Sequence, residues 1–136
     1  MIELPKPGAI VWSDLTVPDA ERIRDFYAAI TGWKVEALTM GDYSDYVMVS
    51  STGDGVAGIC HARGENAKAP AQWLMYVVVE NVDRSAAECV TLGGEIVDGP
   101  RPMSGGQFCI IRDPAGAVCA LFSPPVATVG TIDLQE

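Results

Sequence analysis

Leu15-Thr-Val-Pro-Asp-Ala-Glu-Arg22 and Val77-Val-Val-Glu-Asn-Val-Asp-Arg84 lie 62 residues apart in the chain and carry the same order of local signals. Each stretch combines the end of an apolar strand, an Asp or Asn suited to cap a helix, and the first turn of that helix. The same shift places Gly32 on Gly94, so each helix runs into a glycine able to end it in a left-handed turn. The sequence therefore predicts two copies of one structural unit, matched by the order of elements more than by residue identity.

One helix is predicted in each copy. The first spans about Asp19–Ile30, and its apolar residues follow helical spacing and form a stripe that we expect to be buried, namely Ile23, Phe26, Tyr27 and Ile30. The second spans about Val82–Leu92 and carries smaller apolar side chains. The strand candidates, each bounded by Gly, Pro, Asp or Ser, are Ala9–Thr16, Lys34–Thr39, Tyr46–Ser50, Val56–Ala62, Gln72–Val79, Glu95–Gly99, Gln107–Arg112 and Ala117–Phe122.

This order of elements indicates an α+β fold made of two β-α-β-β-β modules. A chain of 136 residues has the size of one domain and can bury one full hydrophobic core. We expect residues 1–136 to form a single domain, with module one at about 8–62, a linker at 63–71, module two at about 72–124 and a tail at 125–136.

The charge of the chain argues against two classes of partner. It carries 18 acidic and 9 basic residues, a formal net charge of −9, and no cluster of Lys and Arg that could neutralise phosphates. No nucleic acid and no membrane partner is therefore expected, and no stretch reaches the ~20 apolar residues that span a bilayer. Met1–Gly8 holds a Glu and two prolines where a signal peptide would need an apolar core, so we expect a cytoplasmic protein.

The cysteines fit neither a disulfide framework nor a metal site. They form no C-x-x-C pair, and their spacing fits no common zinc finger even with His61, the only histidine. With no secretory context, we expect small buried side chains at all four positions, which are Cys60, Cys89, Cys109 and Cys119.

Several short motifs occur in a recognisable order, which is Leu15-Thr-Val-Pro-Asp19, Phe26-Tyr27, Gly32-Trp33, and Asp113-Pro-Ala-Gly116 before an apolar strand. By this order and spacing, over about residues 8–124, the chain resembles the glyoxalase/bleomycin-resistance/extradiol-dioxygenase group, the vicinal oxygen chelate superfamily. The resemblance implies two modules that form a curved mixed-sheet cup or half-barrel with the helices on the outside. It also implies a homodimer, and a cup that usually binds one divalent metal.

The metal positions implied by this resemblance carry unsuitable side chains. They lie near the start of each module's first strand and in each module's last strand. Three of them fall on Trp12, Leu74 and Ala120, which cannot bind a metal, and the fourth falls within residues 56–61, where only His61 could serve. We therefore expect no metal and no other cofactor, with a divalent metal as the alternative. Because glyoxalase, extradiol cleavage and epimerase chemistry need a metal as Lewis acid, the fold does not imply these reactions here.

Alternation along the predicted strands indicates which side chains would line the cup. We take Trp12, Leu74 and Ala120 to mark the lining face. A turn that pairs Arg112 with Ala117 sets Cys109 opposite Ala120, so Cys109 is expected on that face as well. The predicted ligand-binding residues are largely aromatic with few polar groups, as in small-molecule pockets, although the aromatic rings could instead fill the core. They are Trp12, Tyr46, Met48, Trp73, Tyr76, Gln107, Cys109 and Phe122.

Two residues are candidates for acid–base catalysis. Asp14 would lie on an apolar, aromatic wall that raises the pKa of a carboxyl group, or it could simply reach solvent at the strand end. His61 has the side chain best suited to proton transfer near neutral pH, but its place before the linker also fits a surface histidine. Cys109 would need a neighbouring base to act as a nucleophile, and the sequence offers none.

Three functions fit these features. The first is a glyoxalase/bleomycin-resistance-like protein that binds a small organic molecule in an aromatic cup without metal; its acidic charge suits a cationic or neutral planar ligand. The second is an enzyme of lyase, isomerase or dioxygenase type acting on a small carbonyl or aromatic compound, with a metal or with Asp14 and His61. The third is a protein-binding module that uses the apolar segment Pro124–Val129. The sequence leaves open whether the chain is an enzyme.

Overall fold

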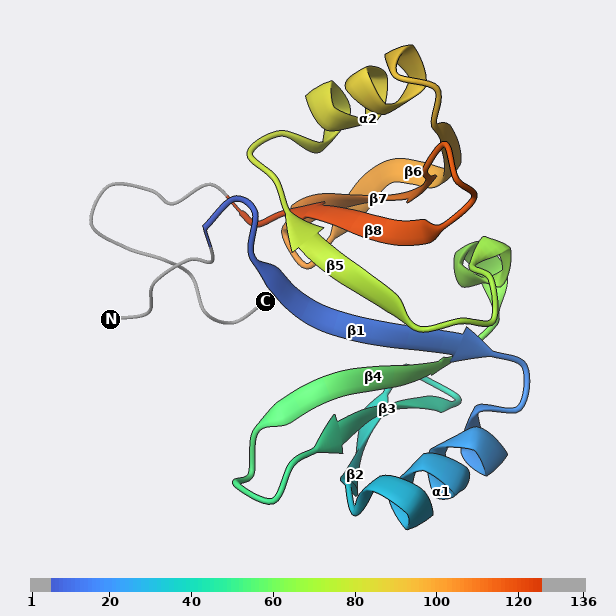
Figure 1. The fold of residues 1–136 in the computed structure, drawn as a ribbon. Helices are drawn as coiled ribbons and strands as arrows, with labels where there is room; N and C mark the ends of the chain where they lie inside the picture. The colour runs from blue at the N-terminus through green and yellow to red at the C-terminus, as the bar shows by residue number, and fades with distance from the viewer. Residues whose placement is uncertain (1–5, 126–136) are drawn as a thin grey trace. The chain divides into compact units, whose positions relative to one another are not determined.

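A computed structural model describes residues 6–125, which form two compact units (Figure 1). The N-terminal unit contains residues 12–75, and the C-terminal unit contains residues 6–11 and 76–125. The division falls inside strands β1 (Ile10–Val17) and β5 (Leu74–Val78). The predicted linker, residues 63–71, holds the short 3-10 helix η1 (Gly64–Lys68) and belongs to the N-terminal unit.

The N-terminal unit has the predicted β-α-β-β-β order. Strand β1 is followed by α1 (Ala20–Thr31), β2 (Lys34–Thr39), β3 (Ser44–Val49) and β4 (Gly55–His61). The strands are ordered β2-β3-β4-β1, with β1 parallel to β4 and the other pairs antiparallel. Helix α1 packs on β2, β3 and β4.

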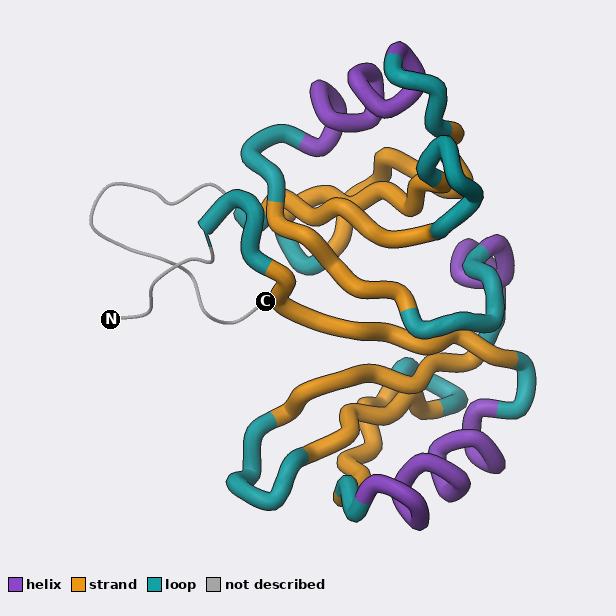
Figure 2. The backbone as a smooth tube through the Cα atoms, viewed as in Figure 1, coloured by secondary structure: helices purple, strands orange, loops and turns teal. Residues whose placement is uncertain are grey.

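The C-terminal unit repeats this topology. Strand β5 is followed by α2 (Val82–Thr91), β6 (Glu95–Met103), β7 (Gly106–Arg112) and β8 (Val118–Ser123). The strands are ordered β5-β8-β7-β6, with β5 parallel to β8, and α2 packs on β6, β7 and β8. Figure 2 shows both helices and all eight strands, so the α+β class and the two-module prediction are confirmed.

The helix ends bear out the predicted Asn81 cap and Gly32 stop, whereas Asp19, at the N-terminus of α1, makes no side-chain capping hydrogen bond. The Asn81 side chain accepts a hydrogen bond from the Arg84 backbone N–H at 2.9 Å, which caps α2. Gly32 ends α1 in the left-handed conformation, with φ of 79°. The left-handed residue after α2 is Gly93, not the predicted Gly94. A side chain at Gly94 would instead collide with the Arg112 carbonyl and the Cys89 sulfur.

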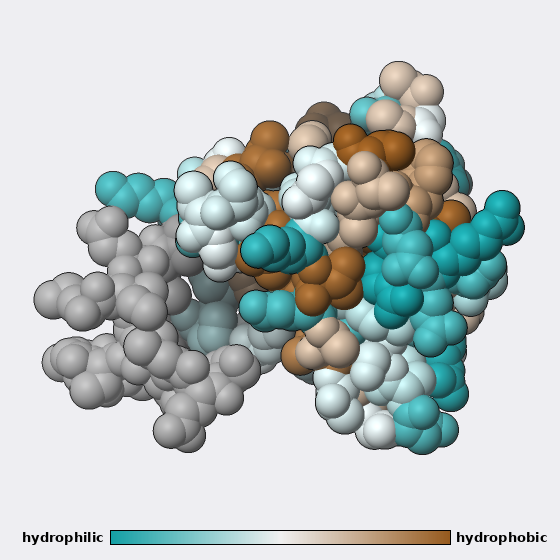
Figure 3. Space-filling model, turned by 90° about the horizontal axis from the view of Figure 1, so that it is seen from below, coloured by the Kyte–Doolittle hydropathy of each residue, from teal (hydrophilic) through white to brown (hydrophobic). Residues whose placement is uncertain are grey.

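The main core of the N-terminal unit lies under α1. Its buried members are Leu15, Ala20, Tyr46, Met48, Ala57 and Ile59. The predicted buried stripe of α1 is only half correct, because Ile23 and Tyr27 pack on this core while Phe26 and Ile30 are 53% and 64% exposed. The molecular surface shown in Figure 3 likewise has apolar residues between hydrophilic ones.

Two further predictions bear on partners. Neither helix within residues 6–125 is long and apolar enough to serve as a membrane span. Residues 126–129 of the candidate protein-binding segment Pro124–Val129, like nearly all of the predicted tail, lie outside the described residues.

Candidate functional site

The helix-free face of the N-terminal sheet carries a compact polar arrangement. Leu15 packs in the core under α1, so its neighbour Asp14 points to the opposite face, together with Trp12. The Trp12 indole N–H donates a hydrogen bond of 2.8 Å to Asp14 Oδ1. The predicted pairing of these two residues on one face is therefore correct, and the indole fixes the orientation of the carboxylate.

Gly58 of β4 makes room for that carboxylate. It is the direct neighbour of Asp14 in the parallel β1–β4 pair, and a Cβ atom at position 58 would collide with Asp14 Oδ1. The missing side chain lets the carboxylate lie across β4. Sequence reasoning missed Gly58, although the 62-residue repeat points to it, since Gly58 is the counterpart of Ala120.

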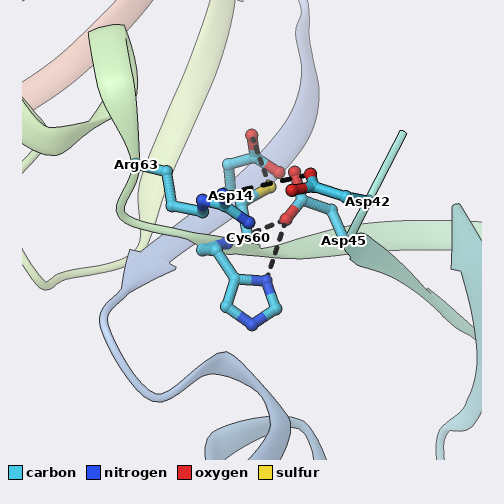
Figure 4. Close-up of polar contacts among 6 residues, drawn as sticks. Asp14, Asp42, Asp45, Cys60 and Arg63 are labelled. Atoms are coloured by element: carbon cyan, nitrogen blue, oxygen red, sulfur yellow. Dashed lines mark hydrogen bonds and ion pairs between the residues drawn. The ribbon is translucent and has the colours of Figure 1, made fainter. Parts of the chain in front are cut away.

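Cys60 lies next to the Asp14 carboxylate (Figure 4). Its sulfur is 4.0 Å from Asp14 Oδ2. Burial, followed by the negative charges of Asp14 and Asp45, raises the pKa of the Cys60 thiol well above its usual range. The thiol therefore stays protonated and acts as a weak donor toward carboxylate, not as a nucleophile.

Strand register identifies the fourth family metal position that the sequence left open. Asp14 pairs with Gly58 in the first unit, and Tyr76 pairs with Ala120 in the second, so Gly58 and Ala120 occupy equivalent places. This position lies within the predicted range of residues 56–61, and His61, the one residue there that could have served as a ligand, is three residues away. Gly58 has no side chain and therefore offers no ligand.

The donor chemistry at these places does not fit a divalent metal. The family resemblance and the repeat imply four positions, Trp12, Gly58, Leu74 and Ala120, and a metal needs oxygen, nitrogen or thiolate donors. Within residues 6–125, no three His, Cys, Asp or Glu side chains gather in a group that could hold a metal ion. No reaction step is therefore assigned to a metal.

His61 is held by a buried carboxylate. Asp45 Oδ1 accepts the His61 backbone N–H at 2.9 Å and lies 3.3 Å from His61 Nδ1. Tyr43 and Tyr46 flank the imidazole, with ring centroids at 5.6 and 6.0 Å. Sequence reasoning singled out His61 but not Asp45, because the contact spans 16 residues and two strands.

Several predicted ligand-binding residues lie elsewhere than expected. Tyr46 and Met48 are buried in the core under α1, where Trp73 packs against them. The Trp73 indole N–H donates to the Tyr27 hydroxyl at 3.0 Å. The prediction that these side chains line a ligand site does not fit this arrangement, because β3 turns Tyr46 and Met48 toward α1 and Trp73 packs on the same core.

In the C-terminal unit, the predicted register of β7 is wrong by one residue. Cys109 pairs with Leu121, not Ala120, and packs under α2 against Val82 and Ala86. Burial, followed by proximity to Cys89, raises the pKa of Cys109 to about 11. By alternation, Gln107 and Cys119 share the side of Cys109, so Cys109 and Gln107 do not line the cup as predicted.

The helix-free face of this unit carries both predicted residues and residues that sequence reasoning missed. Tyr76 and Phe122 lie there as predicted, and Phe108 takes the place assigned to its neighbours. The Arg101 guanidinium lies 4.4 Å from the Phe108 ring centroid and 3.0 Å from Asp98 Oδ2. A register shift in β6 between Asp98 and Arg101 brings this pair together, and Gly-Pro at 99–100 was the available sequence signal.

Comparisons with known proteins agree with this fold. The family described as the Glyoxalase/Bleomycin resistance protein/Dioxygenase superfamily matches residues 9–121. The anthracycline biosynthesis protein DnrV of Streptomyces peucetius is 29% identical over 129 residues, which cover 85% of this chain and 47% of DnrV. CFP32 of Mycobacterium bovis is 26% identical over 118 residues, covering 86% of this chain and 44% of CFP32. The chain thus spans about half the length of these relatives.

A solved structure shows the same fold at low sequence identity. Streptomyces coelicolor methylmalonyl-CoA epimerase, in complex with 2-nitronate-propionyl-CoA, has a TM-score of 0.53 and 17% identity, with 89% of this chain and 100% of that chain covered. This likeness concerns the fold alone, because identity is low and function resides in particular side chains.

Proposed function

The chain belongs to the Glyoxalase/Bleomycin resistance protein/Dioxygenase superfamily, and we propose that it binds a small organic molecule without the divalent metal usual in that superfamily. The observation that carries the proposal is the replacement of all four metal positions by Trp12, Gly58, Leu74 and Ala120. Such positions supply aromatic and apolar contacts in place of a chelate.

The Trp12–Asp14 pair is the proposed anchor for the ligand. The indole N–H is engaged by the carboxylate, so the ring is fixed in one orientation beside a negative charge. A flat aromatic surface next to a carboxylate suits a neutral or cationic planar molecule. The net charge of −9 favours the same ligands, and the similarity to a protein named for anthracycline biosynthesis supports an aromatic compound.

Thermal unfolding with and without metal tests the absence of a metal site. Chelator-treated protein should unfold at the same temperature with Mn, Fe(II), Co, Ni or Zn as without them. A metal ion that binds the folded protein, at a free concentration of about 100 times its Kd, would raise the free energy of unfolding by about 2.7 kcal/mol and Tm by several degrees. A saturable increase that survives in His61→Gln would contradict the proposal.

Proton transfer by Asp14 is the second candidate function. Asp14 Oδ1 accepts from an indole N–H and Oδ2 faces the protonated Cys60 thiol, so the carboxylate has a fixed geometry on an accessible face. If the chain is an enzyme of this kind, Asp14→Asn should abolish turnover while leaving Tm within a few degrees of the wild type. Unchanged turnover in this variant would exclude Asp14 as the acid–base group and leave binding alone.

Assembly as a homodimer and a cytoplasmic location remain predictions from the sequence. Light scattering after size-exclusion chromatography measures the first directly.

A further inference from the structure

His61 and Asp45 form a pair whose geometry differs from an ordinary surface contact. Asp45 is buried, and one of its oxygens faces both the backbone N–H and Nδ1 of His61. A carboxylate can only accept hydrogen bonds, so the neutral imidazole carries its proton on Nδ1 and its lone pair on Nε2. Nε2 of His61 is then the proton acceptor of this pair. The Asp45 carboxylate lies next to the imidazolium that would form when Nε2 takes up a proton.

Aromatic rings surround this imidazole. Tyr43 stands perpendicular to it, with an interplanar angle of 86°, and Tyr46 is tilted by 53° on another side. The His61 side chain is 19% exposed. Tyr43 is partly exposed, so its ring offers an edge on which another aromatic ring can pack, whereas Tyr46 is buried and only holds the imidazole in place.

Two guanidinium groups lie on the outer sides of the tyrosines. Arg63 is 3.8 Å from the Tyr43 ring centroid, and Arg24 is 4.6 Å from that of Tyr46. Their acidic partners, Asp42 and Asp25, are exposed, and such pairs are weak in water. Both guanidinium groups can therefore turn part of their charge toward an anion held near His61.

Together these groups favour one charge distribution in a bound ligand. Asp45 Oδ1 is placed to pair with a proton on Nδ1 of His61, whereas Arg63 and Arg24 suit an anion beside the tyrosines. An aromatic compound with an acidic hydroxyl satisfies both preferences. Its O–H bond breaks, a bond between the proton and Nε2 forms, and the electron pair of the O–H bond remains on oxygen as a phenolate.

We propose that His61, positioned by Asp45, is a proton-accepting site for the acidic hydroxyl of an aromatic ligand of the phenol class. The inference rests on the proposed function as a small-molecule binder and names the class of ligand. It places the hydroxyl at Nε2 of His61 and the phenolate charge near Arg63 and Arg24.

The probe for this site is 4-nitrophenol, whose visible absorption appears only in the phenolate form. Bound to the wild-type protein, it should ionise at a lower pH than the free compound, with an apparent pKa reduced by about one unit, a tenfold shift in its equilibrium. A protein of net charge −9 without such a site would shift the ionisation in the opposite direction. The direction of the shift is therefore diagnostic.

Three variants separate this role from a structural one. His61→Gln should abolish the shift, and Asp45→Asn should weaken binding about tenfold, since a charge-assisted hydrogen bond to the imidazolium is lost. Arg84→Gln removes an exposed guanidinium in the other unit and should behave like the wild type. Nitrogen NMR of the single histidine should show the Nδ1–H form in free wild-type protein and both nitrogens protonated after 4-nitrophenol binds.

Several outcomes would overturn the inference. They are the absence of 4-nitrophenol binding, binding in the neutral form, an equal shift in His61→Gln, or an Nε2–H tautomer in the free protein. Each would leave the metal-free proposal intact, because that proposal depends on the metal titration. Conversely, a metal-induced rise in Tm that survives in His61→Gln would contradict the proposed function without changing the behaviour of 4-nitrophenol at His61.

Discussion

Ile59→Ala is expected to lower the free energy of unfolding by about 2–5 kcal/mol. Ile59 is 0% exposed and lies in the core under α1 with Leu15, Tyr46 and Met48. Truncation removes buried methyl and methylene groups and leaves a cavity that the β-sheet can close only in part. Urea unfolding, followed by circular dichroism and tryptophan fluorescence, measures the loss.

Val56→Ala is the matched control for this variant. Val56 lies in the same strand and also loses methyl groups, but its side chain is partly exposed. Its expected cost is well below that of Ile59→Ala, because only buried groups lose their full transfer free energy. Equal costs for the two substitutions would mean that β4 does not divide a core face from an exposed face as described.

Gly58→Ala is expected to destabilise the protein by about 1–3 kcal/mol and to weaken ligand binding. The new methyl group would occupy the place of Asp14 Oδ1, so the carboxylate must turn away and lose its hydrogen bond to the Trp12 indole. Trp12 would then no longer be fixed in the orientation proposed for ligand stacking. Urea unfolding gives the stability, and a fluorescence titration with an aromatic ligand gives the affinity.

A double-mutant cycle isolates the clash. In Gly58→Ala combined with Asp14→Ala, no carboxylate remains to collide with the new methyl group, so the stability cost should be much smaller than the sum of the two single costs. Strictly additive costs would show that Gly58 is required for another reason. In that case the space over Gly58 would have no role in holding Asp14.

The sequence determined most of the secondary structure of this protein because those signals are local, although β6 runs on to Met103 beyond the predicted end at Gly99. The range Lys34–Thr39 was predicted as the structure has it, and both helices begin and end within one residue of their predicted bounds. Capping residues, glycines and apolar periodicity act within a few residues of each other. The repeat of 62 residues also predicted that the two halves share one order of elements, and both units have the order β-α-β-β-β.

The register of β7 against β8 shows where local signals end. The turn was expected to pair Arg112 with Ala117, but Asp113 instead bonds to Ala117 through its backbone and side chain, which moves the pairing to Val118. A shift of one residue turns every side chain of a strand to the other face. Cys109 is therefore buried under α2, and Phe108 takes its place.

Only the tertiary structure assembled the candidate site. Asp14 could be recognised as a polar residue in an apolar strand, but its partner Gly58 lies 44 residues away and has no side chain to attract notice. His61 could be recognised as the only histidine, while its contact with Asp45 depends on the pairing of β3 with β4. The sequence by itself thus determined the helices, most of the strands and their order. The contacts between strands decided which side chains meet, because hydrogen-bond register and packing join residues that are distant in the chain.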